Sequence, residues 1–190
     1  MMNYVNKGFN GEQVFADLVG SLSQLNLPTL GYVLVKGIKQ TVGKQKSDFL
    51  LSTNEGVFGV SVKCIDGQPP TICSNTPDRN LKKMQEKFNI NTSQIRQLLH
   101  EGFNGYVTEL TELEQSHLVD YISWFIFKGS ATRIDKFGHT PLFMAIVEGK
   151  EIEWHYCQHV LSNIWERLFV ESRHYKTQAG IEQSITIRLL

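Results

Sequence analysis

The sequence has few cysteines and no long apolar run. Three cysteines among 190 residues, Cys64, Cys73 and Cys157, are an odd and sparse set, which argues against a disulfide-stapled secreted domain. The most apolar stretch, around residues 122–127, falls well short of the roughly 20 residues that a membrane-spanning helix needs. The N-terminal segment also lacks the basic-then-apolar layout of a secretion signal. We therefore expect a cytoplasmic protein with no membrane contact.

Excess charge of one sign is also missing. The chain has 19 basic and 19 acidic residues, so bulk electrostatics does not by itself predict a polyanionic partner. The charges are nevertheless uneven, with 10 basic and 7 acidic residues in 1–90 against 9 and 12 in 91–190. Two basic clusters, over residues 36–46 and 79–87, fit either solvated faces or phosphate contacts. With 41% hydrophobic residues, the composition is that of a globular chain able to bury its own core.

Hydrophobic periodicity predicts a mixture of helices and strands. A helix is expected over residues 11–25, where apolar side chains recur at three- and four-residue steps. Short strands are expected over 32–35, 48–52 and 57–63, and the polar turn at 53–56 pairs the last two as a hairpin.

The rest of the chain continues the mixed pattern. Residues 114–127 fit a helix or a strand, since their apolar positions agree with both periods. The remaining expectations are helices over 78–88, 92–101 and, as the longest, 152–171, a proline-rich loop over 64–77 and a final strand over 184–190. Elements in this order predict an α/β fold in the broad sense that includes mixed α+β folds. We expect a single domain over residues 1–190.

One hairpin brings together the residue types that metal-assisted hydrolysis needs. Asp48 begins the first strand, while Ser61 and Lys63 lie two apart on the second strand and therefore share a face. Because neighbouring strands lie about 4.8 Å apart, an acidic side chain at the start of one can lie beside a lysine at the end of the other. A carboxylate there can bind Mg²⁺, which activates water and stabilises charge on phosphorus, and an ammonium group can assist.

These residues form a pattern with Glu12, which lies on the first predicted helix. The order Glu12, Ser47-Asp48, a turn and Ser61-Val62-Lys63 resembles the PD-(D/E)xK nuclease superfamily, with Ser47-Asp48 at the PD position. Together with the segment Gly8-Phe9-Asn10-Gly11-Glu12, the pattern is similar more narrowly to type II restriction endonucleases that cut four-base palindromes. The resemblance implies a restriction-endonuclease-like fold with a central mixed β-sheet flanked by helices. Residues 1–90 would then hold the catalytic core motif, and residues 91–190 would complete the domain.

The resemblance also implies a role for each residue of the pattern. Asp48 would be the central metal ligand, helped by the Val62 carbonyl oxygen, and Glu12 an outer carboxylate that reaches the metal or its water. Lys63 would be the catalytic lysine, with Mg²⁺ as the cofactor and Mn²⁺ as a possible substitute. Ser61 stands where the family usually has Asp or Glu.

The serine at position 61 weakens the expected metal site. A hydroxyl group brings no charge, so we expect lower metal affinity, for which Glu55 or Asp66 could compensate. The alternative interpretation is structural. Asp48 would merely end a turn, and Lys63 would lie at the end of a strand with its aliphatic chain along the protein surface and its amine in water.

The sequence thus predicts a divalent-metal-dependent endodeoxyribonuclease of the type II restriction kind, which hydrolyses double-stranded DNA by attack of an activated water. A palindromic target predicts a homodimer, or two successive nicks by a monomer. Two alternatives stay open: a catalytically weakened nuclease-fold protein that binds nucleic acid or a protein partner, and a nuclease that acts on RNA or as a toxin. The candidate DNA contacts are basic and amide side chains: Lys44, Lys46, Asn75, Arg79, Lys82, Lys83, Arg173 and Lys176.

Other constellations carry weaker signals. His155 and His159 are spaced to share one face of the predicted helix over 152–171, but no acid lies between them, so we interpret them as helix-surface residues. A single ankyrin-like stretch over 135–149 cannot bury its own faces and is expected to form a turn with a strand or helix.

The aromatic run over 121–127 fits core packing better than base stacking. No glycine-rich phosphate loop is recognisable, so no nucleotide cofactor is expected.

Overall fold

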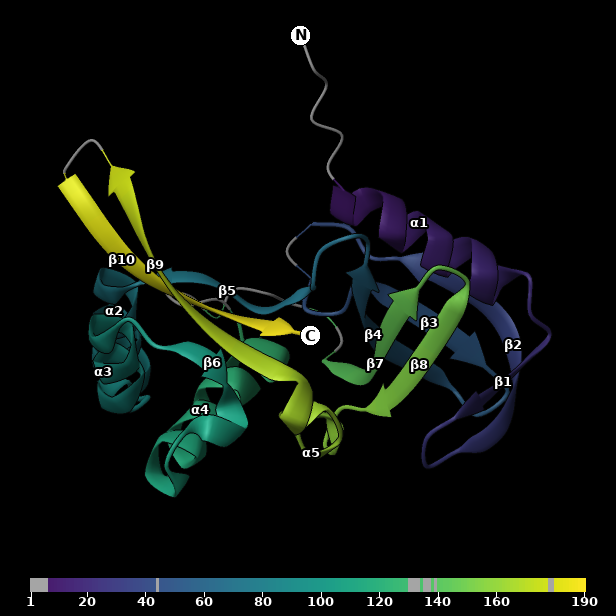
Figure 1. Ribbon diagram of the computed structural model, residues 1–190. Helices are drawn as coiled ribbons and strands as arrows, with labels where there is room; N and C mark the ends of the chain where they lie inside the picture. The colour runs from purple at the N-terminus through teal and green to yellow at the C-terminus, as the bar shows by residue number, and fades with distance from the viewer. Residues whose placement is uncertain (1–6, 44, 130–133, 135–137, 139, 178–179) are drawn as a thin grey trace, which may run out of the picture. The chain divides into compact units, whose positions relative to one another are not determined.

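The computed structural model describes residues 7–43, 45–129, 134, 138, 140–177 and 180–190 (Figure 1). Within these ranges it contains five α-helices and two β-sheets, which confirms the prediction of a mixed α and β protein. The chain divides into two compact units, Met1–Pro70 with Lys136–Val160 and Thr71–Asp135 with Leu161–Leu190. We call them the first and the second unit, and the single domain over residues 1–190 stays a prediction. In the described part of the chain, no helix combines the length and the apolar character needed to cross a bilayer.

One helix and a six-stranded mixed sheet form the first unit. In chain order the elements are α1 Lys7–Gly20, β1 Gln24–Leu27, β2 Gly31–Gln40, β3 Phe49–Thr53, β4 Val57–Ile65, β7 Pro141–Glu148 and β8 Glu151–Tyr156. The strands lie in the order β1-β2-β3-β4-β7-β8, and each neighbouring pair is antiparallel except β4 and β7, which run parallel. This confirms both the mixed sheet and the hairpin, which β3 and β4 form.

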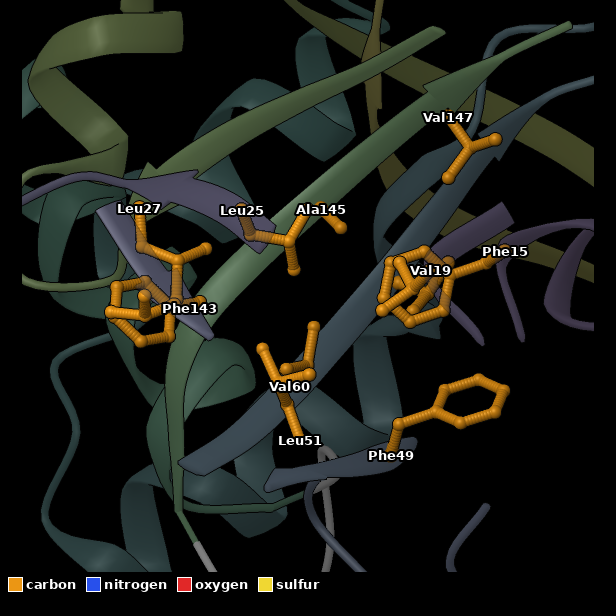
Figure 2. Packing of buried hydrophobic residues seen from close by; sticks show 12 residues of the cluster. Phe15, Val19, Leu25, Leu27, Phe49, Leu51, Val60, Phe143, Ala145 and Val147 are labelled. Carbon is orange, nitrogen blue, oxygen red and sulfur yellow. The ribbon is translucent and has the colours of Figure 1, made fainter. Parts of the chain in front are cut away.

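The core of the first unit lies between α1 and the sheet. Phe15 of α1 packs on Phe49 of β3 with ring centroids 5.1 Å apart, and Val19 lies in the same cluster (Figure 2). Strands β1 and β8 are the two edges of the sheet, yet they contact each other, so the sheet curls around its core. Leu27 of β1 therefore belongs to the same buried cluster as Phe143 of β7. Each such side chain contributes roughly 1.5–3 kcal/mol by leaving water.

Strand β4 separates the core from the candidate site by simple alternation. Val60 and Val62 are buried in the core cluster. Because successive side chains of a strand point to opposite faces, Ser61 and Lys63 project from the other face, where both are half-buried. The shared face that the sequence predicts for these two residues is confirmed.

The second unit combines an antiparallel sheet with helices. In chain order the elements are β5 Thr71–Pro77, α2 Asp78–Phe88, α3 Ser93–Glu101, β6 Asn104–Tyr106, the 3₁₀ turn η1 Val107–Glu109, α4 Glu112–Phe127, α5 Val160–Ile164 at the crossing from the first unit, the 3₁₀ turn η2 Trp165–Arg167, β9 Leu168–Thr177 and β10 Gly180–Leu189. The strands lie in the order β5-β10-β9-β6. The segment 114–127, whose periodicity fits both a helix and a strand, is helical and belongs to α4. A capping box between Thr111 and Glu114 explains where this helix begins.

Helices α2 and α3 lie where the sequence predicts them, and β10 covers the predicted strand over 184–190 but begins earlier, at Gly180. The long helix predicted over residues 152–171 is wrong. Strand β8, helix α5, turn η2 and strand β9 occupy that segment. Ile152 and Trp154 pack against the core of the first unit, while Glu151 and Glu153 are exposed, which is the two-residue period of a strand. His155 is accordingly a buried strand residue, not a helix-surface residue.

Two shorter predictions also need correction. Helix α1 ends at Gly20, not at residue 25, because Leu25 pairs with Val33 in the β1–β2 ladder. The segment 64–77 is only partly a loop, since β5 takes its second half and pairs with β10. Within 135–149, β7 is the strand that one of the two expectations for that stretch requires.

Candidate metal centre

Asp48 is held at the open end of the β3–β4 hairpin by contacts with β4. It lies directly before β3, and its backbone N–H donates to the Val60 carbonyl oxygen at 2.8 Å. Its side-chain Oδ2 accepts hydrogen bonds from the Val62 N–H at 2.7 Å and from the Ser61 hydroxyl at 3.2 Å. The carboxylate therefore accepts the β4 hydrogen bond that a backbone carbonyl of β3 would accept if that strand were longer. Its orientation is set by β4.

The same contacts give the direction of the Val62 carbonyl group. In a strand, the N–H and C=O of one residue point to the same side, and residues two apart repeat that direction. The Val60 C=O and the Val62 N–H both bond to Asp48. The Val62 carbonyl oxygen consequently points toward the edge of β4 at which the Asp48 carboxylate lies, as a shared metal ligand must.

Glu12 reaches this end of the sheet from α1. Its Oε2 accepts a hydrogen bond of 2.7 Å from the Gln40 amide, at the last residue of β2. Burial and the negative charge of Asp48 raise the pKa of Glu12 above 4.5, while the Gln40 hydrogen bond and Lys63 act in the opposite direction. The two carboxylates are thus close enough to repel each other. Gln40 is the residue that sequence reasoning missed, because its contact depends on the register of β2.

Helix α1 approaches β4 closely at this point. A Cβ atom at Gly11 would overlap the Cys64 Sγ, so only glycine fits beside that thiol. Burial, Glu12 and Asp48 raise the pKa of Cys64 to about 11, although Lys63 acts against the shift. At neutral pH the thiol stays protonated and is a poor nucleophile. Lys63 therefore acts on both Glu12 and Cys64, which places its charge at the same end of the sheet.

The donor set fits a hard divalent cation that retains several waters. Mg²⁺ is commonly held by one or two carboxylates together with waters and substrate phosphate, and Asp48, Glu12 and the Val62 carbonyl are donors of this kind. No group of three or more His, Cys, Asp or Glu side chains suited to a metal occurs among the described residues. The low metal affinity expected from Ser61 stays a prediction.

The two acids considered as substitutes for Ser61 differ in position. Glu55 lies in the turn that joins β3 to β4 and accepts a hydrogen bond from Asn54. That turn is at the opposite end of β3 from Asp48, so Glu55 as a compensating ligand is wrong. Asp66 follows directly after β4 and contributes to the raised pKa of Cys64, so it lies on the side of the candidate centre.

The predicted DNA contacts fall in both units, and several are ion-paired. Within the second unit Arg79 pairs with Glu182 at 3.1 Å, Lys82 with Asp78 at 3.3 Å and Arg173 with Glu171 at 2.5 Å. Lys83 and Lys176 are exposed, and in the first unit Lys46 is half-buried. Asn75 belongs to β5, whose side chain at that position is not described, and Lys44 lies outside the described residues. These pairs offset much of the positive charge that the sequence suggests.

Comparisons with known proteins add no relative. No protein-family model, no curated protein and no solved structure matches the chain. Any assignment of a family or an activity is therefore a proposal, which depends on the residue pattern and on the geometry around Asp48.

Proposed function

We propose that the first unit carries the centre of a divalent-metal-dependent endodeoxyribonuclease of the type II restriction kind, on a restriction-endonuclease-like fold. The observation that carries this proposal is the Asp48 carboxylate, which is held at the end of the hairpin and whose charge acts on Glu12 and Cys64, the two groups on which Lys63 also acts. Two carboxylates and one ammonium group at one strand end suit the hydrolysis of a phosphodiester. Double-stranded DNA, a homodimer on a palindromic target and a cytoplasmic location belong to the same proposal.

Each residue then has a distinct task. Asp48, the Val62 carbonyl and Glu12 would hold Mg²⁺, or Mn²⁺ in its place. The bound ion would stabilise negative charge on the phosphate and lower the pKa of the attacking water. Lys63 would orient that water and offset charge on the phosphate oxygens. Ser61 donates its hydroxyl to Asp48 and thereby orients the carboxylate.

DNA would be held mainly through phosphate contacts. Lys83 and Lys176 are exposed and can bind phosphate oxygens directly, whereas Arg79, Lys82 and Arg173 would first exchange their present acidic partners. Phosphate contacts release counterions, so the affinity should fall steeply with salt.

One observation favours a second function, that of a nuclease-fold protein that binds nucleic acid or a protein partner without cutting. With Ser61 in place of an acid, the described centre has two carboxylates, Asp48 and Glu12, so it offers one anionic ligand fewer than the usual pattern. Weak metal binding would then leave only the binding activity.

The deciding experiment is plasmid cleavage with Mg²⁺ or Mn²⁺, with an EDTA control. We expect cleavage by the unchanged chain and a loss of at least about 100-fold in the Asp48→Asn variant, because that change removes the central anionic ligand. The matched control is Asp17→Asn, an exposed carboxylate on α1 that accepts a hydrogen bond from Gln13.

Two outcomes would contradict the proposed endonuclease activity. Full cleavage by Asp48→Asn would remove the proposed centre, and gel shifts without cleavage under any metal would favour the binding protein. Discrete fragments would indicate a specific target, and a smear would indicate little sequence specificity.

A further inference from the structure

Helix α4 in the second unit has a buried apolar face and a second face that carries both aromatic and polar side chains. Leu118, Tyr121, Ile122, Phe125 and Ile126 are buried. The other face carries Asp120, Ser123, Trp124, Phe127 and Lys128, spaced at the three- and four-residue steps of one helical stripe. The aromatic run that the sequence assigns to core packing is therefore divided, because two of its four rings lie on this second face.

That second face forms one wall of an open pocket of about 430 Å³. The opposite wall is the segment between α2 and α3, which contributes Asn89, Ile90 and Asn91. A pocket of this volume suits a small organic ligand. All of its lining residues belong to the second unit, so it is separate from the candidate metal centre.

The aromatic rings at the pocket provide a rigid surface. Phe88 packs on Trp124 with ring centroids 4.7 Å apart and an angle of 32° between the planes, which supports the indole from one side. Trp124 and Phe127 are both half-exposed and line the pocket. An indole ring backed in this way and open to a pocket is suited to stack on a flat heterocycle.

The polar groups at the pocket have a definite hydrogen-bonding pattern. The Asn91 Oδ1 accepts from the Ser93 N–H at 3.1 Å and from the Ser93 hydroxyl at 2.7 Å, so its amide NH₂ is left as the donor. Asp120 is exposed at the pocket and offers a carboxylate that only accepts. Lys128 adds a cation to the same lining.

We infer that this pocket binds a guanine base. Guanine presents two adjacent N–H donor groups, N1–H and the exocyclic amine, which complement the Asp120 carboxylate, and a carbonyl oxygen, O6, which complements the Asn91 amide. Adenine presents a lone pair at N1, which would face the carboxylate and be repelled by it, and this repulsion is the basis of discrimination. Trp124 stacks on the base, and Lys128 contacts a phosphate group. The inference stands independently of the nuclease proposal.

The ligand can be a free guanine nucleotide or an unstacked guanine in a single strand, and one set of titrations separates these sources. Calorimetry with the full chain in EDTA uses GMP, guanosine, AMP and the pentanucleotides dTTGTT and dTTTTT. We expect GMP or dTTGTT to bind with a dissociation constant below about 1 mM, and at least about tenfold more tightly than AMP or dTTTTT. Weaker binding of guanosine than of GMP would assign the phosphate contact to Lys128.

Two variants test the geometry against a matched control. Asp120→Asn removes a carboxylate that is exposed, so the fold should persist, and guanine affinity should fall about tenfold with the loss of its preference over adenine. Trp124→Leu should weaken every base about tenfold by removing the stacking surface. The control, Glu112→Gln, alters an exposed acid on the same helix that does not line the pocket.

The outcomes are decisive in either direction. Absence of binding by both GMP and dTTGTT would overturn the inference, and so would equal affinity for GMP and AMP that Asp120→Asn leaves unchanged. Circular dichroism checks each variant, and if Trp124→Leu unfolds, Asp120→Asn alone decides.

Discussion

The pKa of Glu12 in the first unit is shifted in the opposite direction to the pKa values of Asp78 and Glu171 in the second. In the first unit, burial and a neighbouring carboxylate raise the pKa of Glu12. In the second unit, burial alone would raise the pKa values of Asp78 and Glu171, but arginine and lysine partners lower both. Carboxylates held together against their mutual repulsion are typical of functional sites, whereas paired acids are typical of structural ones. The comparison therefore supports placing the proposed centre at the end of the β3–β4 hairpin.

The largest expected effect is that of Lys63→Ala on cleavage. We expect a loss of at least about 100-fold, because the positive charge of Lys63 acts on Glu12 and on Cys64 at this end of the sheet, while the melting temperature should change little. Plasmid cleavage and thermal unfolding measure the two quantities. Lys39→Ala, an exposed lysine on β2, is the control, and equal activity of both variants would contradict the assignment.

Ser61→Glu should increase the difference between the two units by adding a third carboxylate to Asp48 and Glu12 at the candidate metal centre. Mg²⁺ affinity should rise about tenfold, because hard cations gain most from added anionic oxygen ligands. Without metal, the added repulsion should lower the melting temperature. Calorimetric titration provides the measurement, with Ser21→Glu on an exposed position of the same unit as the control. Unchanged affinity would mean that the side chain at position 61 does not face the ion.

Asp78→Asn tests the paired acids of the second unit. Asp78 contacts Arg96 at 2.7 Å and Lys82 at 3.3 Å, so its loss should cost about 1 kcal/mol in the free energy of unfolding. Because its pKa is lowered in the folded state, this stability is present above pH 3.8 and is lost as the pH falls through the folded value. Urea unfolding at pH 7 and at lower pH, against the exposed control Glu86→Gln, measures the difference. No loss at pH 7 would show that the pairs are not structural.

The smallest expected effect is the pH dependence of stability due to Glu12, with the opposite sign. A raised pKa means that the folded chain binds the proton more tightly than the unfolded chain, so stability falls as the pH rises from 4.5 through the folded value. Glu12→Gln should remove this decline, most clearly at low ionic strength, where the repulsion between the carboxylates is least screened. Thermal unfolding from pH 4 to pH 8 compares the two chains, and parallel curves would contradict the repulsion.

The local parts of the fold and of the centre were predictable from the sequence. The β3–β4 hairpin follows from its polar turn, and the shared face of Ser61 and Lys63 follows from the period of a strand. Strands β8 and β9 were not predictable, because positions such as Ile152 and Tyr156 fit the period of a helix as well as that of a strand. Neither was the neutralisation of Arg79 by Glu182, since no local pattern relates residues so far apart in the chain.

The closeness of Glu12 to Asp48 has its origin in a residue without a side chain. A methyl group at position 11 would collide with Cys64 and lift the first turns of α1 from strand β4, and the carboxylate at the next position would move with them. The reach of the Glu12 carboxylate across the end of this sheet thus depends on Gly11, whose side chain is a single hydrogen atom.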